Sequence, residues 1–280
     1  MIGPVLALAS SLGGGASDFL AGTTSRRIGT MQFMLGSQLV GVVLAGGWLA
    51  IGGAPVPGLA TLAAAAGAGL GATVCLAAFF QAMVVGTISI VAPISATGVV
   101  VPIVAGLVGG ERLGAAQAIG IVAAIAGIGL ASRSPRDRSS VPVESGIGLA
   151  LFAALGGGVF FWLMAPASRH GVAWAVLIAR AVPVLMLAFA LGSRRASLRP
   201  ALAPPVARTI LASALLSFAA IALYAFATLH GQLAIVSVLA SLYPVVTVLL
   251  AYRVLGERVH RAQQIGIATV LAGVVLMSTG

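Results

Sequence analysis

The sequence repeats itself once, and each copy contains an odd number of hydrophobic segments. Gly110-Glu111-Arg112 recurs as Gly256-Glu257-Arg258, and Leu12-Gly13-Gly14-Gly15 recurs as Leu155-Gly156-Gly157-Gly158. Five hydrophobic segments fit in each copy. A unit with five membrane spans begins on one side of a bilayer and ends on the other, so the second copy must enter the membrane from the opposite face. Such inverted repeats form a substrate site near the bilayer midplane, between halves that can rock.

The composition requires a lipid environment. The chain is 60% hydrophobic and 7% charged, whereas a soluble domain has about 25% charged residues. Its formal net charge is +10, and all 15 basic residues are arginine. These arginines mostly lie in short loops between apolar segments, where we expect them to contact anionic lipid head groups. We therefore do not expect binding to nucleic acid, in spite of the high positive charge.

Ten segments approach the length of about 20 apolar residues that a membrane-spanning helix needs. The predicted fold class is an all-α membrane protein, with ten transmembrane helices arranged as two inverted five-helix repeats. The first repeat is expected at residues 1–132, a connecting loop at 133–144 and the second repeat at 145–280. The ten predicted spans are 2–23, 30–51, 58–80, 86–108, 114–132, 145–166, 172–191, 206–229, 232–254 and 260–279.

The distribution of arginine predicts an orientation. The loops after spans one, five, seven and nine hold most of the arginines, and the opposite side holds Arg112 and Arg169. Arginine-rich loops tend to stay in the cytoplasm. With ten spans, this rule would place both termini outside.

Asp18 is an ionisable residue inside the first span, and such a residue is a functional candidate because its charge is costly in lipid. Ser11, Gly14, Gly15 and Gly22 lie at helical spacing from Asp18, so they share its face of the helix. This small and polar face suits the lining of a cavity. Asp18 could take up and release protons during transport; the alternative is a structural salt bridge or hydrogen bond.

Arg180 lies near the middle of the seventh span. It could bind a carboxylate or phosphate of a substrate. It could equally neutralise Asp18 across the repeat interface, or make a structural contact with the backbone, because an unpaired arginine is costly at this depth.

Spans four and nine concentrate hydroxyl groups and prolines, with Pro93 and Pro102 in one and Pro244 in the other. Bent helices at matching positions of two repeats point to a transport pathway, although proline can also serve packing alone. Trp162 corresponds to Phe19 in the repeat. It could stack on a substrate or fill space between helices.

The repeat pattern resembles the drug/metabolite transporter superfamily, in particular its EamA-type carriers. The segments that carry the resemblance are Val91-Ala92-Pro93-Ile94-Ser95, Gly110-Glu111-Arg112, Ser241-Leu242-Tyr243-Pro244 and Gly256-Glu257-Arg258. The resemblance implies a secondary carrier of the bacterial inner membrane, often an exporter of amino acids or related metabolites. It also implies that both termini lie in the cytoplasm, which conflicts with the arginine count.

The resemblance further implies a central cavity lined by spans one, three, four, six, eight and nine. Transferred by position, it supports a set of candidate cavity residues, to which Arg180 is added from its own chemistry. The predicted substrate-binding residues are Asp18, Gln81, Ser95, Trp162, Arg180, Tyr224, Ser241 and Tyr243.

The leading hypothesis is a secondary active transporter of a small organic solute that works by alternating access, with Asp18 coupling protons. A passive channel or facilitator and a membrane subunit that transports nothing are the alternatives. No nucleophile elbow, metal-ligand spacing or phosphate-binding loop is visible, so neither an enzyme nor a cofactor or metal site is expected.

Overall fold

The computed structural model describes residues 2–85, 94–95, 97–131, 144–193, 203–255 and 261–278, and the elements within these ranges are all helical. In lipid, backbone N–H and C=O groups have no water to bind, so a helix that satisfies them internally is favoured. The helices are α1 (Ile2–Ile28), α2 (Thr30–Gly52), α3 (Leu59–Val85), the short 3₁₀ helix η1 (Thr97–Val99), α5 (Val100–Val108), α6 (Ala115–Ala131), α7 (Glu144–Ser168), α8 (Val172–Ser193), α9 (Pro204–His230), α10 (Leu233–Ala240), α11 (Tyr243–Leu255) and α12 (Arg261–Ser278).

The prediction of an all-helical membrane protein is confirmed, and the arrangement of ten spans as two inverted repeats stays a prediction. Seven helical segments of the described chain are long and apolar enough to cross a membrane. Three shorter apolar helices cover Thr97–Val108, Ala115–Leu130 and Arg261–Met277. Much of the predicted fourth span, including Pro93, lies outside the described residues.

The predicted ninth span corresponds to one candidate membrane span, Leu233–Val254, with a short break inside it. It is interrupted at Ser241–Leu242, which separates α10 from α11. Pro244 occupies the second residue of α11. Proline has no N–H group to donate, so it fits the first turn of a helix, where that group would have no partner within the helix. Pro244 therefore lies in the first turn of α11, directly after the two-residue break in this span.

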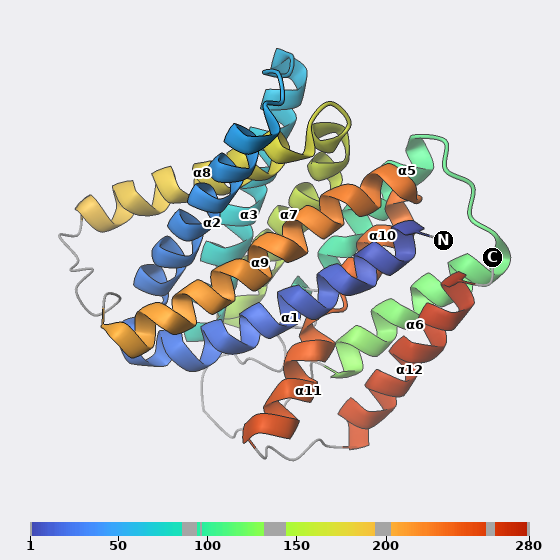
Figure 1. Ribbon diagram of the computed structural model, residues 1–280. Helices are drawn as coiled ribbons and strands as arrows, with labels where there is room; N and C mark the ends of the chain where they lie inside the picture. The colour runs from blue at the N-terminus through green and yellow to red at the C-terminus, as the bar shows by residue number, and fades with distance from the viewer. Residues whose placement is uncertain are drawn as a thin grey trace.

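The last helices of the two predicted repeats, α6 and α12, lie side by side (Figure 1). Glycines line the contact between them. A Cβ atom at Gly120 would lie 2.7 Å from the carbonyl oxygen of Gly273, and one at Gly127 would lie 2.7 Å from that of Gly266. The two backbones can approach this closely only because side chains are absent. As the residue number rises along α6 it falls along α12, so these two helices are antiparallel.

The other helices also pack across the repeats in matching pairs. Helix α1 packs against α9, and its counterpart α7 packs against α3. Gly13 lies close to the backbone of Leu216, while its repeat equivalent Gly156 lies close to the backbone of Gly71. Helices α2 and α8, which are equivalent in the predicted repeats, also contact each other. Gly41 contacts Arg180, and Ala54 accepts a hydrogen bond from Trp174. The residue number rises along one helix as it falls along the other, so the two helices are antiparallel.

The core consists mainly of small residues, and much of the outside is apolar. Alanine supplies many of the fully buried positions, so the helices pack closely. Large apolar side chains point outward, including Val43 (72% exposed) and Phe189 (81% exposed). Lipid can solvate this outer surface, and water cannot.

Candidate functional site

Arg180 is completely enclosed at the middle of three helices. It is 0% exposed. Its Nη1 donates to Oε1 of Gln38 on α2 at 2.7 Å, and its Nη2 donates to Oγ of Ser217 on α9 at 2.8 Å. Its Nε has no hydrogen-bond partner. The guanidinium lies against the bare backbone of Gly41, where a Cβ atom would be 2.5 Å from Nη1.

These contacts decide between the structural alternatives for Arg180. The structure describes the side chains of two acidic residues, Asp18 and Glu111, and neither forms an ion pair with Arg180. The alternative in which Asp18 neutralises Arg180 is therefore wrong for this structure. The partners are a neutral amide and a neutral hydroxyl, so the positive charge has no described counter-charge.

Asp18 has the opposite environment. Its side chain is exposed, yet the face of α1 on which it lies is directed toward the bundle. It follows Gly14 by four residues and Gly15 by three, and both glycines pack against Tyr243 of α11. Leu12, which is 60% exposed, lies roughly 120° round the helix from Asp18. The exposed side chain of Asp18 is thus directed toward the side of α1 that packs against α11, and not toward the side marked by Leu12.

Two residues from other helices lie near Asp18. Cys75 of α3 and Tyr243 of α11 are both close enough for electrostatic interaction with its carboxyl group. Cys75 also lies at the contact between α3 and Gly157 of α7. The sequence interpretation did not include Cys75 in the site, because a single cysteine in an apolar run carries no pattern of its own.

Tyr224 forms a second buried polar centre. Its hydroxyl donates to the carbonyl oxygen of Phe161 on α7 at 2.7 Å and lies 2.8 Å from Oγ of Ser237 on α10. The rings of Phe161 and Tyr224 meet edge to face at 4.9 Å. Phe161 was missed from the sequence, although the repeat offset that relates Leu12 to Leu155 also relates Asp18 to Phe161.

The remaining predicted residues do not gather around one point. Trp162 is 43% exposed and lies two helical turns after Leu155, on the same outward face. Gln81 is exposed near the end of α3. Ser95 donates to the carbonyl oxygen of Ala150 at 3.4 Å, and Ser241 to that of Val238 at 2.8 Å. The structure thus brings Asp18 and Tyr243 together. Ser217, which binds Arg180, and Tyr224 lie two helical turns apart on the same face of α9.

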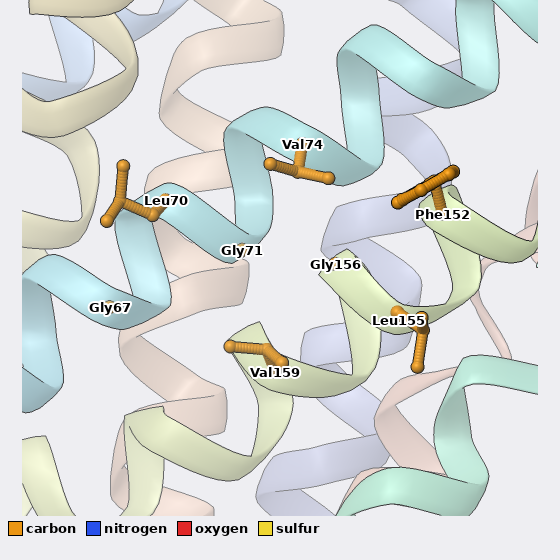
Figure 2. Close-up of a pocket in the computed structure, with 8 residues that line it drawn as sticks. All are labelled: Gly67, Leu70, Gly71, Val74, Phe152, Leu155, Gly156 and Val159. Carbon is orange, nitrogen blue, oxygen red and sulfur yellow. The ribbon is translucent and has the colours of Figure 1, made fainter. Parts of the chain in front are cut away.

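Two hollows in the described structure contain none of the predicted residues. One, of about 360 Å³, lies between α3 and α7, where Val74, Phe152, Leu155 and Val159 border it (Figure 2). The other, of about 330 Å³, lies between α11 and α12. The exposed apolar lining of the first, such as Phe152 at 62%, is typical of a surface that lipid covers.

Glu111 joins the two repeats at one end of the bundle. Its carboxylate accepts the backbone N–H groups of Leu233, and of Ala234 at 3.0 Å, which begin α10. Gln232 of the same turn donates to the carbonyl oxygen of Arg112 at 3.1 Å. A carboxylate at a helix N-terminus binds free N–H groups and is stabilised by the helix dipole, and here it does so across the repeats.

A scan against protein families matches residues 144–279 to the EamA-like transporter family. The resemblance to EamA-type carriers is thus confirmed for this part of the chain. This family is part of the drug/metabolite transporter superfamily, whose members are membrane transporters, and the apolar helices of the chain agree with a multi-pass membrane protein. No curated protein matches it in sequence. One solved structure, titled "Crystal structure of protein", shares its fold with a TM-score of 0.78 at 15% identity, and the similarity covers 99% of this chain and 96% of that one.

Proposed function

We propose that this EamA-like chain is a secondary active transporter that moves a small organic solute by alternating access across a bacterial inner membrane. The solute is an amino acid or a related metabolite, and the direction is export. The chain has ten spans, in which residues 1–132 and 145–280 are inverted repeats joined by the loop 133–144. Membrane lipids and the solute are its partners.

The observation that carries this proposal is the pairing of equivalent helices. Helices α6 and α12 end their repeats and pack antiparallel, with Gly120 against Gly273 and Gly127 against Gly266. Exchanging the two repeats turns one of these contacts into the other. Antiparallel packing of equivalent helices is what an inverted repeat requires, and two such halves can rock about their shared contacts.

Asp18 is proposed to couple transport to protons. It is accessible although it faces the bundle, and Tyr243 and Cys75 lie near it. A carboxyl group that solvent reaches can exchange protons with one side of the membrane in each conformation of the carrier. The fully enclosed Arg180 is unsuited to that role.

Counterflow in proteoliposomes tests the carrier. Vesicles loaded with unlabelled amino acids and placed in trace labelled amino acid should accumulate label transiently, and uptake should saturate. A channel would let label equilibrate without this overshoot, and a non-transporting subunit would give no uptake above empty vesicles. Either result would refute the carrier.

The Asp18→Asn variant tests the coupling. We expect an imposed pH gradient to drive net accumulation by the wild type but not by Asp18→Asn, which should keep counterflow because exchange needs no net proton movement. A variant that still responds to the pH gradient would remove Asp18 from the coupling step while leaving the carrier intact.

A further inference from the structure

Arg180 carries a charge that the described structure does not balance. The residue lies in the middle of α8 (Val172–Ser193), its partner Ser217 is at the centre of α9 (Pro204–His230), and Gly41 is at the centre of α2 (Thr30–Gly52). This site is therefore as far from both ends of these helices as the chain allows. Burying an ion there without a counter-ion costs several kcal/mol.

The hydrogen bonds of Arg180 leave one of its donors without a partner. A guanidinium has five N–H donors in a planar fork, and its Nε, which lies on one edge of that fork, is buried and unpartnered. The two partners, Gln38 and Ser217, each have a donor as well as an acceptor. Both can turn to donate to an anion held by the guanidinium.

The chain shapes this position for a guanidinium. Gly41 puts bare backbone against the side chain, and a Cβ atom there would lie 2.5 Å from Nη1 and 2.6 Å from Cδ of Arg180. Elsewhere on the same helix, Gly46 and Gly47 have no atom within 4 Å of such a Cβ. Of these three glycines, only Gly41 is needed to make space for the side chain of Arg180.

We propose that Arg180 is the anion-recognition residue of this transporter, and that its solute presents a carboxylate to the guanidinium. This inference rests on the proposed function and names the class of solute. A carboxylate fits the planar fork in a bidentate manner and supplies the missing negative charge. Because Arg180 is enclosed, the structure corresponds to a state in which this site is closed to both sides.

The test measures thermal unfolding of the purified chain in detergent with matched pairs of probes. L-leucine is compared with L-leucinamide, L-threonine with L-threoninamide, and propionate with propionamide, at constant ionic strength. The amide of each pair keeps the shape and loses the negative charge. We expect an acid to raise Tm as its concentration rises, because binding stabilises the folded state, and its amide to leave Tm unchanged.

Two variants assign the effect to Arg180. Arg180→Gln should abolish the difference between acid and amide. Gly41→Ala, which keeps the arginine but displaces it, should weaken the difference, and Gly47→Ala should not change it. If Arg180→Gln fails to fold, the contrast between Gly41→Ala and Gly47→Ala decides the question.

The inference is overturned if no acid raises Tm above its amide, if inorganic phosphate alone does so, or if Arg180→Gln keeps the difference. Its failure is separate from that of the carrier. Undiminished counterflow by Arg180→Gln would refute the anion site but support the carrier. Carboxylate binding at Arg180 without counterflow would support the anion site but refute the carrier.

Discussion

Asp18 and Arg180 are both ionisable residues inside apolar helices, and the structure treats them in opposite ways. Arg180 is 0% exposed and bound by Gln38 and Ser217, while Asp18 is exposed beside α11. A proton-exchanging group needs contact with water, whereas a fixed charge that selects a ligand gains strength from enclosure. The position of an ionisable residue within an apolar segment therefore does not determine whether its charge is enclosed or exposed.

Cysteine labelling tests the difference in accessibility between Asp18 and Arg180 most directly. In a Cys75→Ala background, Asp18→Cys should react readily with a sulfonated, membrane-impermeant methanethiosulfonate, and Arg180→Cys should not react. The thiolate must meet the reagent in water, and only the first position is accessible. The background protein is the control. Equal reaction at both positions would show that Arg180 is not sealed.

Thermal stability should separate the two residues next. We expect Arg180→Gln to raise the free energy of unfolding, because removing an unbalanced buried charge relieves several kcal/mol, more than the about 1–3 kcal/mol lost when Gln38 or Ser217 has no partner. Asp18→Asn should change it by no more than about 0.5 kcal/mol, as is usual for an accessible position. Melting of both variants in the same detergent measures the difference. A larger change in stability for Asp18→Asn than for Arg180→Gln would reverse our assignment of the two environments.

The smallest expected effect compares Asp18 with the residue before it. Ser17 is buried, and its hydroxyl donates to the carbonyl oxygen of Ser213 at 3.0 Å. Ser17→Ala should therefore cost about 0.5–1.5 kcal/mol, more than Asp18→Asn, although the two residues are adjacent. A melting curve for Ser17→Ala that matches the wild type would indicate that the bond between α1 and α9 adds nothing to stability.

The sequence predicted the helices better than the site. Long apolar segments and the repeated glycines identify α1, α6 and their counterparts because the constraints of lipid act on each segment by itself. The partners of Arg180 could not be predicted, because Gln38 lies 142 residues away and nothing local distinguishes it from other polar residues in spans. The same applies to the exposure of Asp18, which depends on how α11 packs beside it.

The repeat offset held information that the sequence interpretation used incompletely. It placed Trp162 opposite Phe19, but applied to Asp18 it leads to Phe161, whose carbonyl oxygen and ring both contact Tyr224. One repeat thus has a carboxyl group where the other has a phenyl ring. This difference makes the two halves chemically unequal on the same backbone framework.

The carboxylate of Glu111 has a consequence for motion. It belongs to the first repeat and holds the opening turn of α10 in the second. If the halves separate at this end, two backbone N–H groups lose their acceptor in the same event, so parting the halves and loosening α10 become a single step. Water must replace both hydrogen bonds at once, so we expect this end of the bundle to open in one step rather than gradually.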